Sequence, residues 1–108
     1  MDDFNLHDGQ LHCEEVPLAT IAAQVGTPVY VYSTATMCRR AEALRSALEP
    51  LGDPLICYAV KASPNVAVVA TLARAGLGVD IVSGGEYRRA RVAGVPGNKI
   101  VFSGVGKM

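Results

Sequence analysis

The sequence predicts an α/β fold in which parallel strands alternate with helices. Short apolar, β-branched segments alternate with segments of helical periodicity through the second half of the chain. The expected elements are a strand at 55–62, a helix at 65–75, a strand at 79–82, a helix at 84–93 and a strand at 100–103. Strands joined through helices of this length pair in parallel. The pattern fits either an open doubly wound sheet or a (β/α) barrel.

The first third of the chain mixes charged residues with two expected elements. Apolar residues recur at helical spacing over Leu18–Val25, and β-branched and aromatic residues at 29–32 predict a strand. Ser33 or Thr34 can cap the helix that follows. The apolar residues of that helix, expected to face the core, are Met37 or Cys38, Ala41, Leu44, Leu48 and Leu51.

Turn and cap residues set the expected ends of the later helices. Ser63 followed by Pro64 predicts a capping residue with proline in the first helical position. Gly76 and Gly94 predict the carboxyl ends of the two helices between the strands.

Composition excludes several classes of function. The 108 residues carry ten basic and ten acidic side chains, so no net charge favours nucleic acid or an anionic membrane. The sequence has no apolar stretch of the roughly 18 residues that a membrane span needs. Three cysteines are an odd number without zinc-type spacing, and with His7 and His12 they form no recognised metal-ligand pattern. We expect a cytoplasmic protein without a metal.

A lysine and an aspartate break the apolar pattern of the expected strands. The strand period of two places Lys61 on the face that carries Cys57 and Ala59, and Asp80 on the corresponding face of the next strand. Parallel α/β folds place their chemistry at the carboxyl ends of strands. The pair is therefore either a functional site or a simple ion pair at the rim of the sheet, with the lysine extended to water.

Three sequence strings resemble a known family. They are YAVKA at 58–62, DIVSGGE at 80–86 and FSGVGK at 102–107. In order and spacing they are similar to the diaminopimelate decarboxylase family, within the alanine-racemase-like class of pyridoxal-phosphate enzymes. The first string is shared with ornithine and arginine decarboxylases, whereas the other two favour the diaminopimelate branch. Ser63 departs from the asparagine that commonly follows Lys-Ala in the family.

The resemblance implies a cofactor and roles for particular residues. Lys61 is expected to bind pyridoxal 5'-phosphate covalently and to be catalytic, with Asp80 close to the cofactor. Glu86 is either an active-site group or part of a capping box with Ser83, in which each residue satisfies a free backbone amide at the start of a helix. Gly84 and Gly85 are expected to serve a tight strand-to-helix turn.

The resemblance also implies an activity and the extent of the missing part. The family converts the amino acid meso-2,6-diaminopimelate to L-lysine and carbon dioxide, and a homodimer is expected for the full-length enzyme. A (β/α)8 barrel takes about 250 residues, so this chain supplies about three of its eight strands. We expect a leader with the first strand of a β-domain at 1–33, and an incomplete barrel at 34–108. The alternatives are a sister decarboxylase of the ornithine or arginine type, or a truncated chain without catalysis. The fragment alone is expected to be inactive.

Overall fold

The structure is a computed structural model that describes residues 2–105. It divides into two compact units at the boundary between Arg39 and Arg40. In the described part of the chain, no helix is both long enough and apolar enough to cross a membrane.

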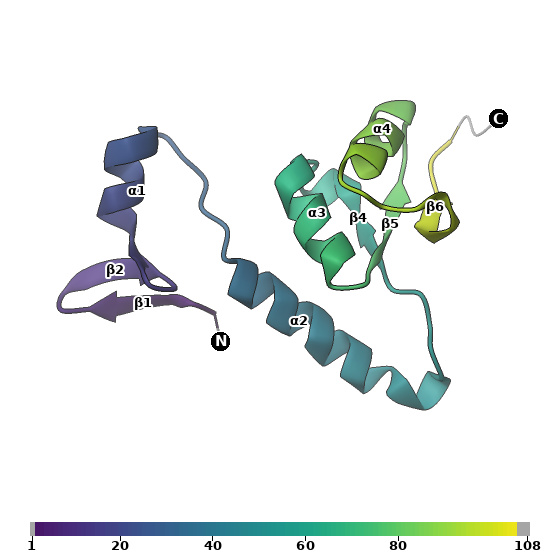
Figure 1. Cartoon of the computed structure of the whole chain (residues 1–108), viewed down its shortest axis with the longest axis horizontal. Coiled ribbons are helices and arrows are strands. Elements are labelled where there is room, and N and C mark those ends of the chain that lie inside the picture. The colour runs from purple at the N-terminus through teal and green to yellow at the C-terminus, as the bar shows by residue number, and fades with distance from the viewer. Residues whose placement is uncertain (1, 106–108) are drawn as a thin grey trace. The chain divides into compact units, whose positions relative to one another are not determined.

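The first unit opens with a small antiparallel sheet that the sequence analysis missed. Its strands are ordered β1-β2-β3 and are followed directly by α1 (Figure 1). Their bounds are Phe4–His7 for β1, Gln10–Cys13 for β2, Val16–Pro17 for β3 and Leu18–Val25 for α1. Asp8 and Gly9 join β1 to β2 with φ angles of 53° and 79°. Two consecutive positive φ angles match the twist of a hairpin, and an aspartate-glycine pair adopts them readily.

The prediction of a strand at 29–32 is wrong. These residues are assigned to no helix or strand, and the Tyr30 side chain is 88% exposed. A β-strand requires a hydrogen-bonded neighbour, and none of the described residues supplies one here. Residue preference alone therefore gives no strand.

Helix α2 begins where the sequence predicts and ends earlier. It spans Thr34–Ala47, and the hydroxyl of Ser33 accepts a hydrogen bond from the amide of Thr36 at 3.0 Å. Its expected core face is only partly buried: Ala41 is the one buried residue of α2, Met37 and Cys38 are half-buried, and Leu44 is 48% exposed. A 3₁₀ turn at Glu49–Leu51 follows, because Pro50 cannot continue the α-helical bonding.

The second unit contains the predicted alternation of strands and helices. Three parallel strands are ordered β4-β5-β6 (Figure 1). In β5, Val79 pairs with Tyr58 of β4 on one side and with Ile100 of β6 on the other. The elements are β4 Cys57–Ala59, α3 Val66–Arg74, β5 Gly78–Ile81, α4 Gly84–Val92 and β6 Ile100–Phe102. All except β5, which keeps its four residues but begins and ends one residue earlier, are shorter than predicted, while type and order are confirmed.

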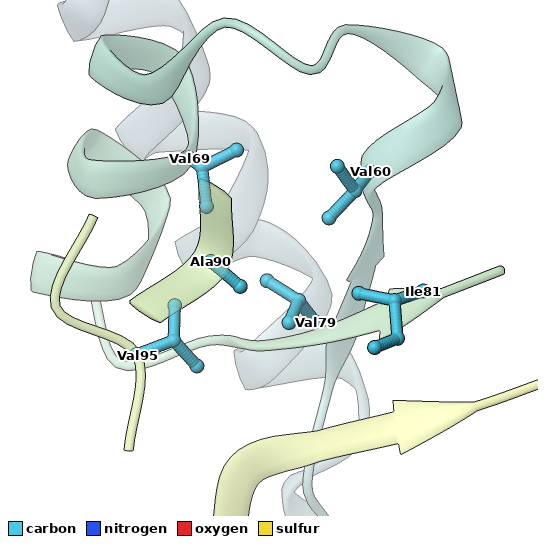
Figure 2. Close-up of a cluster of buried hydrophobic side chains, with 6 residues drawn as sticks. All are labelled: Val60, Val69, Val79, Ile81, Ala90 and Val95. Carbon is cyan, nitrogen blue, oxygen red and sulfur yellow. The ribbon is translucent and has the colours of Figure 1, made fainter. Parts of the chain in front are cut away.

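One face of this sheet forms the core together with α3 and α4. Figure 2 shows the six buried residues: Val60, Val69, Val79, Ile81, Ala90 and Val95. Tyr58, Ile100 and Phe102 are partly buried against the cluster. The predicted helix ends are confirmed at Gly76 and Gly94, whose φ angles of 96° and 94° lie in the left-handed region that favours glycine.

The predicted cap of α3 is wrong by two residues. Asn65 is the capping residue, and its Oδ1 accepts hydrogen bonds from the amides of Ala67 at 2.8 Å and Val68 at 3.3 Å. Ser63 is extended instead, with φ of −159° and ψ of 107°, as expected for a residue before proline. Pro64 therefore lies outside the helix.

Candidate functional site

The sheet face opposite the core carries the polar residues that the sequence singles out. Strand register pairs Ala59 with Asp80 and Asp80 with Val101, so these three lie on one face. Val79 and Ile81 lie on the core face instead. The predicted division of β5 into an apolar face and an Asp80 face is confirmed. None of the six core residues lies on the Asp80 face, and Val101 is 46% exposed.

Lys61 lies just beyond the end of β4, which corrects the prediction that it continues the strand. The strand ends at Ala59, and residues Val60–Ala62 form a 3₁₀ turn. Val60, the first residue of the turn, is directed into the core and is fully buried (Figure 2). Lys61 is exposed at the carboxyl edge of the sheet, and the turn packs against β5.

Asp80 bonds to a serine on the next strand rather than to Lys61. The hydroxyl of Ser103 donates to Asp80 Oδ1 at 2.5 Å. Within residues 2–105 the ion pairs are Arg39 with Asp3 and Arg45 with Glu42, so the alternative of a Lys61–Asp80 ion pair is not observed. Lys61 makes no side-chain hydrogen bond to another described residue either.

Cys57 lies on the same face, one strand from Asp80. Partial burial raises the pKa of the Cys57 thiol, and the negative charge of Asp80 raises this pKa further. Both effects disfavour the thiolate, which is the reactive form. We therefore assign no nucleophilic role to Cys57; with Ala59 it places small side chains on the Asp80 face of β4.

The bonds of Glu86 are those of a helix cap. Ser83 Oγ accepts a hydrogen bond from the Glu86 amide at 3.1 Å, and Glu86 Oε1 accepts one from the Val82 amide at 2.9 Å. This supports the capping interpretation of the sequence, with one difference: Glu86 accepts from the amide of Val82, one residue before the capping residue Ser83. The connection from β5 to α4 is short, as expected, but glycine is not required for it. A Cβ at Gly84 or Gly85 would meet no atom closer than 3.8 Å.

Two hydroxyl groups at this edge were missed by the sequence analysis. Ser103 is two residues beyond Val101, so strand parity indicates that it shares the Asp80 face. Tyr58 lies on the core side, and its hydroxyl donates to the backbone carbonyl of Ser63 at 3.1 Å. Sequence gives no signal for this second bond, because it depends on the turn at Lys61.

The third sequence string lies partly outside the described residues. Gly106 and Lys107 are not described, whereas Gly104 lies tightly against Val82, the residue that follows β5. A Cβ at Gly104 would be 2.8 Å from the carbonyl oxygen of Val82. Glycine is therefore needed where the segment after β6 passes the end of β5.

A pocket of about 290 Å³ lies at the opposite edge of the sheet. Its lining includes Leu55, Gly76 and Lys99, which precede the three strands. Arg45 Nη2 already donates to the carbonyl of Ala75 at 2.6 Å, and Lys99 Nζ to that of Gly76 at 3.4 Å. These cations serve the carboxyl end of α3, so the candidate site remains the Lys61 edge.

Metal-ligating side chains do not gather in the described part of the chain. No group of three or more histidine, cysteine, aspartate or glutamate residues lies together there. The His7 and His12 rings have their centroids 4.8 Å apart, which makes a ring contact between two neighbouring strands.

Comparison with known proteins identifies the family. Residues 34–108 match the family model described as pyridoxal-dependent decarboxylase, pyridoxal binding domain. The chain belongs to the pyridoxal-dependent decarboxylases. The match confirms pyridoxal phosphate as the cofactor of the family.

Among these decarboxylases, the chain is similar to diaminopimelate decarboxylases over nearly all its residues. It is 56% identical to the diaminopimelate decarboxylase of Vibrio cholerae over 110 residues and 50% identical to that of Zymomonas mobilis over 109. Each match covers 99% of this chain and 26% of the relative. The resemblance read from the three strings is confirmed.

A solved structure supports the same relationship. The crystal structure of diaminopimelate decarboxylase from M. jannaschii, in co-complex with L-lysine, matches with a TM-score of 0.83 and 35% identity. The match covers 99% of this chain and 26% of the M. jannaschii chain. The chain therefore spans about a quarter of the length of these relatives.

Proposed function

We propose that this chain is the N-terminal part of a diaminopimelate decarboxylase and that Lys61 carries the cofactor. The observation behind the proposal is the position of the Lys61 amine. It is exposed at the carboxyl edge of a parallel sheet, without an ion pair to another residue of 2–105, in a chain of the pyridoxal-binding family. The reaction is the conversion of meso-2,6-diaminopimelate to L-lysine and carbon dioxide.

The residues at this edge fit pyridoxal phosphate. A primary amine is the group that reacts with the cofactor's aldehyde. Cys57 and Ala59 are small and share the Asp80 face, so they leave room for a ring beside Lys61. When bound, pyridoxal phosphate supplies a conjugated ring that takes up the electron pair released as carbon dioxide leaves.

The chain's own residues hold and orient the reacting groups. Lys61 Nζ fixes the cofactor, and when free it can carry a proton to or from the substrate. The Ser103 hydroxyl holds one oxygen of Asp80 and so fixes the orientation of this carboxylate, on the sheet face that also carries Cys57 and Ala59. We propose Asp80 as a cofactor-binding residue on this basis.

We also propose the finer fold and assembly. Residues 34–108 form the first part of a (β/α)8 barrel, supported by the three parallel strands and by the start of the family match at residue 34. Residues 1–33 form a leader joined to a β-domain. The complete enzyme is a homodimer, and the three free cysteines of this chain favour the reducing cytoplasm.

Borohydride reduction of the complete holoenzyme, followed by peptide mapping, tests the cofactor assignment. We expect the label on Lys61, and Lys61→Ala should abolish both the label and the visible absorbance of bound cofactor. Lys99→Ala, which changes a lysine at the opposite edge of the sheet, is the matched control and should label normally. A label on any other lysine contradicts the assignment.

Carbon dioxide release from different amino acids tests the reaction. The complete enzyme should act on meso-2,6-diaminopimelate far faster than on ornithine or arginine, and Lys61→Ala should reduce the rate by several orders of magnitude. Since each 1.36 kcal/mol corresponds to about tenfold in rate, a lost surface contact cannot produce such a decrease. Preference for ornithine or arginine would instead favour the sister enzymes, and no release from any of them would favour a chain without catalysis.

A further inference from the structure

We propose that Tyr58 and Arg89 are positioning residues that hold the Lys61 turn in place from two sides. The inference deepens the proposed function and rests on it. It concerns the segment between the end of β4 and the start of α3, which contains Lys61 and has few backbone bonds of its own.

The backbone of this segment is poorly tied to the rest of the unit. Beyond bonds internal to helices, strands and 3₁₀ turns, no backbone–backbone hydrogen bond of the described residues involves positions 60–64. Pro64 has no amide hydrogen to donate, and Ser63 is extended. Val60 anchors one end of the turn by its complete burial, and Asn65 begins the helix at the other end. The residues between them need another constraint.

Tyr58 supplies the stronger constraint. Its ring is partly buried against the core, and its hydroxyl donates to the carbonyl oxygen of Ser63 at 3.1 Å. Donor and acceptor therefore lie on either side of Lys61 in the sequence, three residues before it and two after. A bond between them closes the turn that carries the lysine. Because the Tyr58 ring is packed against the core, the donor of this bond is held in a fixed position.

Arg89 supplies the second constraint from another element. Its Nη1 donates to the carbonyl oxygen of Pro64 at 3.3 Å, and it comes from α4, which packs against α3. The Arg89 side chain is exposed and its bond is longer, so we expect it to contribute less than Tyr58 does. The two bonds act on consecutive carbonyl groups directly after the lysine turn.

Position matters here because a covalent bond has to form at one atom. Misplacement of a reacting group by about 1 Å can reduce a rate by about a hundredfold. A single neutral hydrogen bond has a smaller effect, so its loss should slow attachment by roughly three- to tenfold.

The test measures how fast pyridoxal phosphate attaches to the apo form of the complete enzyme. The readouts are the growth of the visible absorbance band, the borohydride label on the Lys61 peptide, and the melting temperature. Tyr58→Phe removes only the hydroxyl, and Ser63→Ala is its control because the accepting group is the backbone carbonyl. Arg89→Ala is paired with Arg91→Ala, since Arg91 donates to the Tyr87 hydroxyl on the same helix and makes no hydrogen bond to the described residues of this segment.

We expect Tyr58→Phe to slow attachment roughly three- to tenfold and Arg89→Ala about twofold, with wild-type rates for both controls. Deuterium exchange at the amides of Lys61 and Ala62 should quicken in the two test variants alone. If Tyr58→Phe fails to fold, the surface variant Arg89→Ala decides on the same readouts.

Two results would overturn the inference. One is attachment at the wild-type rate in both test variants, and the other is an equal slowing in Ser63→Ala. If wild-type enzyme carries the borohydride label on another lysine, the proposed function itself is wrong. This result is distinguishable from a failure of the positioning role, in which the label stays on Lys61.

Discussion

The carboxylate of Glu14 accepts a hydrogen bond from the hydroxyl of Ser33 at 2.7 Å and another from the amide of Ala35 at 3.1 Å. The same serine hydroxyl accepts from the Thr36 amide, so one residue links the hairpin sheet to the first turn of α2. Asp3 makes a second link, with its Oδ2 accepting from Thr36 Oγ1 at 2.7 Å and from Arg39 at 2.6 Å. Two carboxylates of the leader thus serve the amino end of one helix, where negative charge is favoured.

These links should weaken in acid. The Ser33 and Ala35 bonds hold the pKa of Glu14 below its ordinary value of 4.5, and Arg39 and Thr36 hold that of Asp3 below 3.8. A lowered pKa gives stability that is present above the ordinary value and is lost as the pH falls through the folded value. We expect Glu14→Gln to lower the melting temperature of the complete enzyme near neutral pH, and the difference from wild type to shrink below about pH 4.

Glu15→Gln is the matched control, because no described residue bonds the Glu15 carboxylate. It should show no such pH-dependent difference. A Glu14→Gln difference that stays constant down to pH 3 would show that the ionised carboxylate is not what stabilises this junction.

Asn65, and not Ser63, should determine the stability of α3. The Asn65 side chain accepts two amide bonds at the start of the helix, so Asn65→Ala should cost about 1 kcal/mol of unfolding free energy. Ser63→Ala should have a much smaller effect, although sequence preference favours serine before proline as the cap. Thermal unfolding of the two variants checks this. A larger loss of stability in Ser63→Ala than in Asn65→Ala would show that Ser63 is the capping residue after all.

The sequence predicts the second unit well because its signals are local and mutually consistent. Apolar strands, helical periodicity and the glycines at 76 and 94 all agree with the parallel β4-β5-β6 sheet. The first unit was predicted less well. The Asp8-Gly9 pair is a hairpin signal, but the four-residue strands on either side, FNLH and QLHC, are short and contain few apolar residues, so their apolar pattern is weak.

The candidate site could be predicted only in part for a similar reason. Strand parity correctly placed Asp80, because β5 is regular through that residue. Lys61 was misplaced because β4 ends at Ala59, three residues before the predicted end of the strand, and Lys61 lies in the 3₁₀ turn that follows. Contacts that depend on that turn, such as the Tyr58 bond to Ser63, follow from tertiary structure and have no pattern in the sequence.

Gly78 should tolerate no side chain. A Cβ there would overlap the backbone carbonyl of Lys99 and lie 3.2 Å from Leu55 Cδ1. Because a backbone cannot move aside as a flexible side chain does, Gly78→Ala should lose about 1–3 kcal/mol of stability or more. Gly85→Ala, at an open position in the first turn of α4, is the control and should melt like wild type. Equal melting temperatures for the two variants would contradict the close approach of β5 to the segment before β6.

Glu86 can be tested as a cap against a role in the reaction. Its Oε1 accepts the Val82 amide bond at 2.9 Å, and a glutamine side chain can accept the same bond through its amide oxygen. Glu86→Gln should therefore retain most of the stability and activity of the complete enzyme. Glu86→Ala removes the acceptor and should cost about 1–2 kcal/mol of unfolding free energy.

Melting temperature and carbon dioxide release, measured on both variants, separate the two roles. A Glu86→Gln enzyme that melts like wild type, binds cofactor and yet releases carbon dioxide a hundredfold more slowly would show that the negative charge acts in the reaction, and the capping interpretation would then be incomplete.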